Sequence, residues 1–140
     1  MPKVTIDIPE KCHFETTINV RITDLNYGNH VGTDNMVSLI HEARFKLFAS
    51  LGYSEMDIEG TRILISDLVV LYKAESFYGD VLRFEISVCG FNKYGCEIFY
   101  RISDLKDNKP IANAKTGVVF KDKKTEQLTS PPQKFISMFS

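Results

Sequence analysis

The sequence predicts an α+β fold in which an antiparallel sheet packs against one long helix. Only one long stretch, residues 35–51, repeats apolar residues at helical spacing. Strand-like runs lie on both sides of it, and the turns between the later runs are short and carry Gly, Asn, Asp or Pro. Such turns favour antiparallel hairpins over parallel crossovers. We therefore expect five strands and one helix in a single domain, residues 1–140.

The composition limits the class of protein. The chain has 140 residues, of which 44% are hydrophobic and 25% charged, the balance of one globular domain. A net charge of -1 argues against a nucleic-acid partner. No apolar run approaches the roughly 20 residues that span a bilayer, and the first residues lack the apolar core of a secretion signal. We expect a cytoplasmic protein that acts on small molecules, with no membrane partner.

No metal or cofactor is expected. Cys12, Cys89 and Cys96 form no Cys-x-x-Cys pair, so the sequence indicates neither a disulfide framework nor a zinc site. His41-Glu42 begins like a zinc-protease helix but lacks the second histidine. Cys96 falls on the apolar side of a strand-like run, where we expect a small buried hydrophobe.

Two candidate strands precede the helix. Residues 4–8 alternate apolar and polar side chains, so they either add an edge strand or lie along the surface. Residues 16–23 alternate more regularly and place Ile18, Val20 and Ile22 on one face. This second strand leads directly into a polar loop.

The helix is predicted to span residues 35–51. Thr33 or Asp34 is suited to cap its first turn, and Gly52 lies where a helix commonly ends in a left-handed turn. Its apolar surface is wider than a single stripe, so we expect it to be covered on several sides. The residues of this surface are Met36, Val37, Leu39, Ile40, Ala43, Phe45, Leu47, Phe48 and Leu51.

Four strand-like runs follow the helix: residues 63–72, 82–88, 96–103 and 112–120. The first is nearly continuous in apolar residues, which predicts cover on both faces, by the helix and by a second subunit. The other three alternate, as strands with one wet face do. Residues 135–139 form a short apolar tail that we expect to dock as a final helical turn.

The order of these features resembles the hotdog-fold acyl-CoA thioesterases of the 4-hydroxybenzoyl-CoA thioesterase type. The shared features are a strand, a polar loop with Gly and His-Val, a helix with Glu-Ala-Arg at residues 42–44, a strand closing on Tyr72, and Gly79-Asp80 before the next strand. The match covers residues 14–135; the loop alone also resembles plant acyl-carrier-protein thioesterases. The resemblance implies a hotdog fold, with a five-stranded antiparallel sheet wrapped around a central helix, in a homodimer or homotetramer.

The resemblance also implies where the substrate binds. An acyl thioester of coenzyme A or of an acyl carrier protein would lie at the start of the helix, at a subunit interface, so that coenzyme A is part of the substrate. Unpaired N–H groups of residues 31–35 would polarise its carbonyl. The implied substrate-binding residues are Asp24, Tyr27, Asn29, Val31, Gly32, Thr33, Asn35, Tyr72 and Lys73.

One position departs from the family pattern, Asp-x-Asp-x-x-Gly-His-Val, whose second Asp is the catalytic carboxylate. Aligning His30-Val31 with His-Val places Asp24 on the first Asp and Asn26 on the second. An amide cannot take a proton at neutral pH, although it can orient a water molecule. We therefore predict three candidate catalytic residues, Asn26, His30 and Glu42.

Each candidate base has an alternative role. His30 is either a general base or a structural hydrogen-bonding residue. Glu42 is either a carboxylate projected from the helix toward the substrate or a partner of Arg44. Asp24 and Asp34 are typical of turn and capping residues. Tyr72 either lines the acyl channel or packs with its hydroxyl at the rim.

The predicted function is hydrolysis of an acyl thioester, with acyl-CoA as the expected substrate. Because of Asn26, an alternative is a hotdog protein that binds acyl-CoA or acyl carrier protein without cleaving it. A hotdog enoyl-CoA hydratase is a further alternative, since Asp24, Asn26 and His30 come near that pattern, but the histidine falls one residue late and the usual proline is missing.

Overall fold

The computed structural model describes residues 4–140. The described residues do not include Met1, Pro2 and Lys3. These three belong to the N-terminal segment from which we predicted that there is no secretion signal. The elements are β1 (Phe14–Asn19), a 3-10 turn (Ile22–Asp24), α1 (Thr33–Ser50), β2 (Thr61–Tyr72), β3 (Val81–Cys89), β4 (Gly95–Asp104), β5 (Pro110–Asp122), β6 (Leu128–Thr129) and α2 (Gln133–Ser137).

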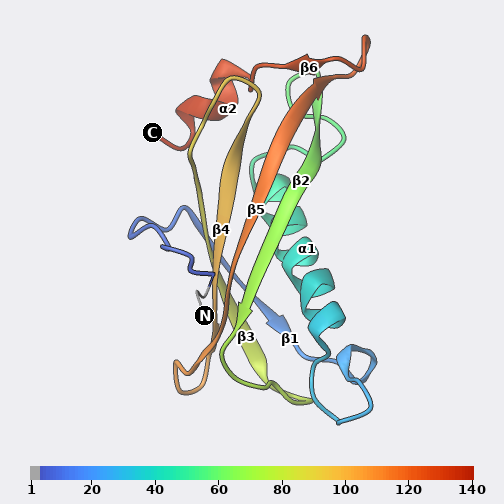
Figure 1. Cartoon of the computed structure of the whole chain (residues 1–140), viewed down its shortest axis with the longest axis vertical. Coiled ribbons are helices and arrows are strands. Elements are labelled where there is room, and N and C mark those ends of the chain that lie inside the picture. The colour runs from blue at the N-terminus through green and yellow to red at the C-terminus, as the bar shows by residue number, and fades with distance from the viewer. Residues whose placement is uncertain (1–3) are drawn as a thin grey trace.

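The strands form one antiparallel sheet that curves around α1 (Figure 1). Its order is β1-β3-β4-β5-β2, and the short β6 pairs with β5. All five long strands were predicted, and they pair antiparallel as expected. The predicted α+β hotdog architecture is confirmed.

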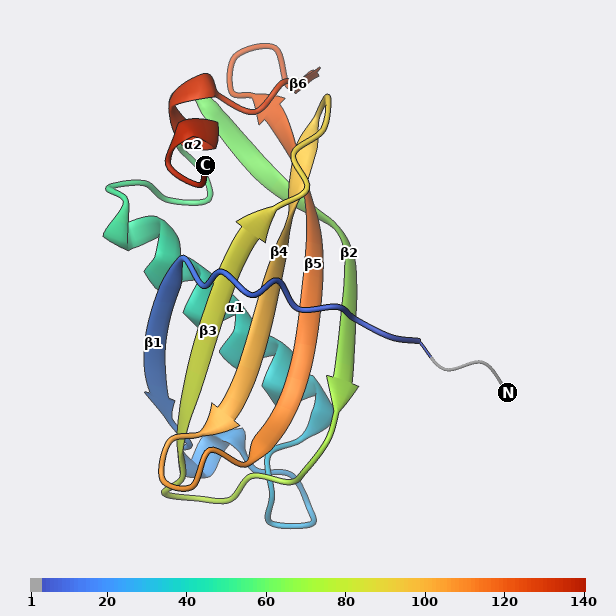
Figure 2. The ribbon, with the colours of Figure 1, turned by 90° about the vertical axis from the view of Figure 1, so that its left-hand side faces the viewer.

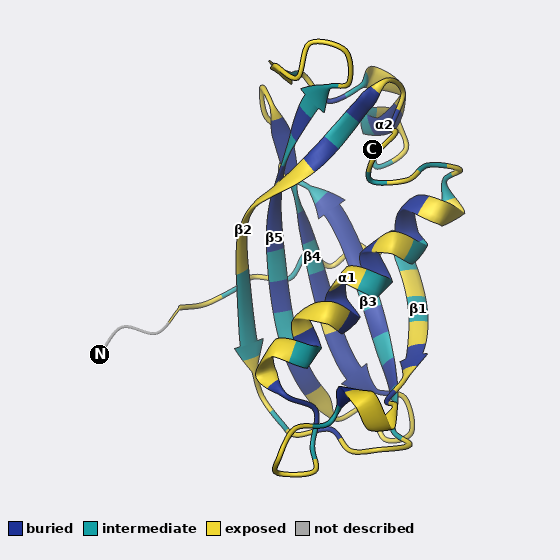
Figure 3. Cartoon of the chain, turned by 90° about the vertical axis from the view of Figure 1, so that its right-hand side faces the viewer, coloured by how far each residue is buried: buried dark blue, intermediate teal, exposed yellow. Residues whose placement is uncertain are grey.

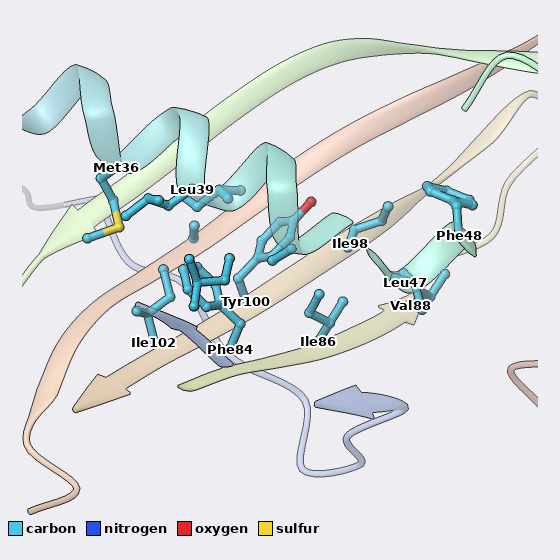
Figure 4. Packing of buried hydrophobic residues seen from close by; sticks show 14 of the residues in the cluster. Met36, Leu39, Leu47, Phe48, Phe84, Ile86, Val88, Ile98, Tyr100 and Ile102 are labelled. Carbon is cyan, nitrogen blue, oxygen red and sulfur yellow. The ribbon is translucent and has the colours of Figure 1, made fainter. Parts of the chain in front are cut away.

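The core lies between α1 and the concave face of the sheet (Figure 3). Leu82, Phe84 and Ile86 of β3 are fully buried because alternate residues of a strand point to the same face. Figure 4 shows Phe84 and Ile86 facing Met36, Leu39 and other residues of α1. The alternation in β4 is confirmed as well, and Cys96 is buried as predicted.

The helix begins two residues earlier than predicted. Gly32 occupies the N-cap position without a side-chain hydrogen bond, so Thr33 and Asp34 belong to the first turn and do not cap it. The end was predicted more closely, since α1 stops at Ser50 and Gly52 adopts a φ of 81°. An uncapped first turn leaves backbone donors that need another partner.

The strand before the helix is shorter than residues 16–23. β1 ends at Asn19, and the chain then leaves the sheet into the 3-10 turn. Ile22, expected on the buried face with Ile18 and Val20, is therefore 68% exposed.

The link between β2 and β3 is not a hairpin, contrary to the prediction that the short turns between the later strands form hairpins. β2 pairs with β5, whereas β3 pairs with β1 and β4. Residues 73–80 must therefore cross the end of the sheet, and in Figure 2 this segment passes along the end where α1 begins. Val31 donates its N–H to the carbonyl of Ser76 in this crossing segment at 2.9 Å.

β2 is an edge strand and is only partly covered in the single chain. Leu64, Ile65 and Leu68 remain 37–40% exposed, so the predicted cover on both faces is not met by residues of this chain. Residues 4–8 form no strand and cross the outer face of the sheet (Figure 2).

The C-terminal tail docks as the predicted helical turn. Phe135 of α2 is fully buried, and its ring lies 5.9 Å from that of Phe48 and 5.6 Å from that of Phe120. Within residues 4–140, no helix has the length and apolar character that crossing a membrane requires.

Candidate active site

The polar loop before α1 is a tight turn. The N–H of Asn26 donates to the carbonyl of His30 at 2.9 Å, and the N–H of Asn29 donates to the carbonyl of Asn26 at 3.1 Å. The side-chain Oδ1 of Asn26 accepts a further bond from the N–H of Gly28 at 2.9 Å. Asn29 has a φ of 63°, a left-handed conformation that Asn adopts more readily than most residues. These bonds hold the loop in one shape.

The first turn of α1 presents three unpaired backbone donors. Val31 donates its N–H to Ser76, and the N–H of Gly32 lies 3.3 Å from the carbonyl of Asp24, so the predicted donors at these two positions are already occupied. The first bond inside the helix runs from the N–H of Met36 to the carbonyl of Gly32. Among residues 4–140, nothing accepts from the N–H groups of residues 33–35. These donors carry the partial positive charge of the helix N-terminus.

His30 precedes these donors in the chain and has one ring nitrogen available. Its Nδ1 is 3.1 Å from the carbonyl oxygen of Val31. A carbonyl oxygen only accepts, so Nδ1 carries the proton and Nε2 of the neutral ring keeps a lone pair. Nε2 lies 4.0 Å from Oε1 of Glu75 in the crossing segment. The arrangement suits a group that takes up a proton at Nε2.

Asn26 lies close to both His30 and the helix terminus. A methyl group at Gly28 would be 3.0 Å from His30 Nε2 and 3.4 Å from Asn26 Oδ1. A methyl group at Gly32 would be 3.3 Å from the Asn26 Cβ and only 2.5 Å from Oδ1 of Asn35. Glycine at position 32 therefore allows the loop to pack against the first turn of the helix.

Tyr72 joins the end of β2 to the same turn. Its hydroxyl donates to the carbonyl of Thr33 at 2.6 Å. Burial, and to a smaller extent the nearby charge of Asp34, raises the pKa of this hydroxyl, so it stays protonated as a donor. The residue is 47% exposed.

The remaining predicted residues are placed differently. Asp24 is buried and accepts from the backbone N–H of Arg21 at 2.8 Å and from its guanidinium, so it holds the 3-10 turn. Tyr27 is fully exposed at the tip of the loop. Lys73 directly follows Tyr72, the last residue of β2, and lines a pocket with side chains of β3, β4 and β5.

Glu42 is not brought to the loop. It lines a groove beside β1 with Thr17 and Arg21, and it pairs with Lys46 at 3.5 Å. Its predicted alternative partner, Arg44, instead donates to Glu55 at 2.7 Å. The structure therefore groups Asn26 and His30 with residues 33–35 and leaves Glu42 apart.

Sequence reasoning missed Glu75 and Ser76. Both lie in the segment that was expected to form a hairpin, and they reach the loop only because this segment crosses the end of the sheet. Ser76 is 2% exposed, and its Oγ makes no hydrogen bond within the described part of the chain. Ser or Glu in a polar connection carries no local signal of such a contact.

Comparison with known proteins identifies the family. The model of the thioesterase-like superfamily matches residues 20–139. The chain belongs to this superfamily. No curated protein sequence shows significant similarity to it.

Solved structures share the fold at low sequence identity. A 1,4-dihydroxy-2-naphthoyl-CoA thioesterase from Synechocystis is 18% identical, with a TM-score of 0.82 over 90% of this chain and 94% of that chain. A DHNA-CoA thioesterase from Staphylococcus aureus is 20% identical, with a TM-score of 0.75 over 88% and 83%. A gentisyl-coenzyme A thioesterase is 14% identical, with a TM-score of 0.76 over 90% and 98%. These similarities confirm the hotdog fold.

Proposed function

We propose that this protein hydrolyses an acyl thioester, with acyl-CoA as the substrate. The observation that carries the proposal is the set of three unpaired N–H groups at residues 33–35. It is joined by the Nε2 of His30, shortly before them in the chain, which makes no hydrogen bond within the described residues. Membership of the thioesterase-like superfamily supports the reaction type. Donors held rigidly where negative charge develops lower a barrier by several kcal/mol.

In the proposed reaction, Nε2 of His30 takes a proton from a water molecule while the water oxygen attacks the thioester carbon. The electron pair of the C=O bond moves to the oxygen, which accepts hydrogen bonds from the helix N–H groups. The C–S bond then breaks as the intermediate collapses. Sulfur takes the proton from the imidazolium, so that a carboxylic acid and a free thiol leave.

Asn26 would position the attacking water. Its Oδ1 is engaged by the Gly28 N–H, whereas its Nδ2 has no partner among residues 4–140. Nδ2 can therefore donate to the water and direct a lone pair of that water toward the carbonyl. Asn26 cannot act as the base, which leaves that role to His30.

A panel of acyl-CoAs tests this function directly. The relatives named as thioesterases of 1,4-dihydroxy-2-naphthoyl-CoA and gentisyl-CoA make aromatic acyl groups the first choice, followed by short, medium and long acyl chains. Free thiol would be measured with purified full-length protein. Turnover above a buffer blank on at least one thioester is expected, and its absence on all of them would rule out hydrolysis.

A second candidate function is binding of an acyl thioester without hydrolysis. The resemblance implies that Asn26 stands in the position of the family carboxylate, and the specific observation is that its Oδ1 accepts from the N–H of Gly28 within the turn. This alternative predicts saturable acyl-CoA binding with no thiol released, and hydrolysis that first appears in Asn26→Asp. Thiol release by the unaltered protein decides against it.

We also propose that the protein is a homodimer or homotetramer that pairs through β2. Ile65 and Leu68, whose β5 partners Val118 and Thr116 are both buried, leave exposed apolar surface on one face of this edge strand. An unpaired strand edge is a natural pairing site. Light scattering on a sizing column tests the proposal. Leu68→Asp should shift the mass toward the monomer, whereas the control Leu105→Asp, at a similarly exposed loop residue, should not.

A further inference from the structure

We infer that a pocket on the outer face of the sheet binds a phosphate group. The outer face is the one turned away from α1, and Figure 2 views it directly. The pocket has a volume of about 450 Å³ and lies over β3, β4 and β5. Its position follows from strand register, because Arg83 pairs with Ser103, and Arg101 pairs with both Glu85 and Asn113 across neighbouring strands.

The pocket is positively charged. Lys73, Arg83 and Arg101 line it, against one carboxylate, Glu85. Neither Lys73 nor Arg101 has an ion pair or side-chain hydrogen bond within residues 4–140, so both cations are available to a ligand. The lining residues carry a formal charge of +2, and Glu15, which lies beside Arg83, reduces the local charge to +1. The pocket therefore still favours the charge of about -2 that a phosphate monoester carries.

Two polar atoms in the lining lack hydrogen-bond partners within the described residues. Ser103 is 7% exposed, and its buried Oγ makes no hydrogen bond. The Nε of Arg83 is also buried without one, although it lies 3.7 Å from Oε2 of Glu15. Buried polar atoms normally have partners, so these two indicate a site that a ligand completes.

Arg83 is already oriented for such a ligand. Its Nη1 donates to Oδ1 of Asn108 at 2.8 Å, which fixes the plane of the guanidinium. A planar guanidinium donates two parallel hydrogen bonds to phosphate oxygens, and a second Arg with a Lys adds charge-assisted bonds. The hydroxyl of Ser103 supplies a neutral donor. Together these groups match the three acceptor oxygens of a phosphate.

The pocket lies at the end of the sheet where the candidate active site is found. Lys73 follows Tyr72, whose hydroxyl contacts Thr33 in the first turn of α1. Successive residues of a strand point to opposite faces, so the two sites lie on opposite sides of the same sheet end. The phosphate group would belong either to the nucleotide of coenzyme A, an assignment that rests on the proposed function, or to a separate phosphorylated molecule.

The site is tested by titrating inorganic phosphate into the full-length protein and following backbone amide signals by NMR. Signals of Arg101 and Ser103 should shift together and saturate. Arg101→Gln should raise the dissociation constant for phosphate by about tenfold or more, the change expected from the loss of one charged hydrogen bond. Lys124→Gln, which removes the same charge from an exposed turn after β5, should leave it unchanged. Arg101 is exposed, so its replacement should not prevent folding.

Competition then identifies the source of the phosphate. If coenzyme A displaces inorganic phosphate and dephospho-coenzyme A does not, the 3′-phosphate of coenzyme A occupies the pocket. If neither displaces it, a separate phosphorylated ligand does. No saturable shift at these residues, or equal weakening in Arg101→Gln and Lys124→Gln, would overturn the inference. Phosphate binding is measured without turnover, so its result does not depend on whether the protein hydrolyses a thioester.

Discussion

The two ends of α1 are built in opposite ways. At its C-terminal end, the buried ring of Phe135 packs against the rings of Phe48, Phe91 and Phe120, with centroids 5.6–6.0 Å apart. At its N-terminal end, a polar loop leaves three backbone donors and the Nε2 of His30 without hydrogen bonds among the described residues. One end of the helix is closed by apolar packing, whereas the other offers hydrogen-bonding groups to a ligand.

This difference separates stability from chemistry along one element. Aromatic burial contributes several kcal/mol for each ring and needs no ligand. Unpaired donors contribute nothing to folding and are useful only when a substrate accepts from them. Changes at the two ends should therefore affect different measurements, and each prediction below tests that separation.

The largest effect is expected from His30→Gln, at the open end. Loss of the proton acceptor should lower turnover of the best thioester by about 10²–10⁴-fold, the usual contribution of a general base. His41→Gln is the matched control, because that side chain is exposed on α1 and pairs only with Glu55 within the described residues. Equal turnover in His30→Gln and the unaltered protein would remove His30 from the chemistry.

At the closed end, Phe135→Ala should lower the free energy of unfolding by about 3–5 kcal/mol, because it leaves a cavity among packed rings. Under conditions where the variant remains folded, its turnover should be unchanged. Urea denaturation and activity would be measured on the same samples, with Met138→Ala, which is 40% exposed, as the control. A large fall in turnover of the folded variant would show that the two ends are coupled.

The smallest effect is expected from treating the folded protein with a thiol reagent. Burial raises the pKa of Cys96 to about 12, with smaller contributions from Cys89 and Glu97. The thiol should stay protonated as pH rises from about 7 to 9, and a protonated, buried thiol is unreactive. Labelling should therefore modify the exposed Cys12 in the folded protein and reach Cys96 only in urea. Rapid labelling of Cys96 in the Cys12→Ser variant would contradict the closed packing.

The fold was largely predictable because its strands alternate locally. Leu82, Phe84 and Ile86 needed only their spacing to be placed on the buried face. The predicted burial of Ile22 was wrong because the neighbouring residues do not indicate where the pairing of β1 with β3 ends. The prediction of a hairpin before β3 was wrong for a related reason, because a turn sequence does not determine which strands pair.

The candidate site was predictable only in part. Asn26 and His30 are close in sequence and in space, so the loop pattern brought them together. Glu42 was expected near them from its place on the helix, but the helix turns it toward β1. Glu75 reaches His30 from 45 positions along the chain, and that contact depends on the crossing of the sheet end. Long-range contacts of this kind have no local signature.

The turnover of Thr33→Pro tests the role of the helix N-terminus most directly. Proline is favoured at the first position of a helix, and Gly32 before it has φ -69° and ψ 155°, which proline accepts in its neighbour. The change therefore removes one N–H donor while keeping the fold, and Thr33→Ala, which keeps the N–H, is the control. We expect an unchanged melting temperature and a kcat about 10²–10³-fold lower for Thr33→Pro alone. A kcat equal to that of Thr33→Ala would contradict the role of the helix terminus.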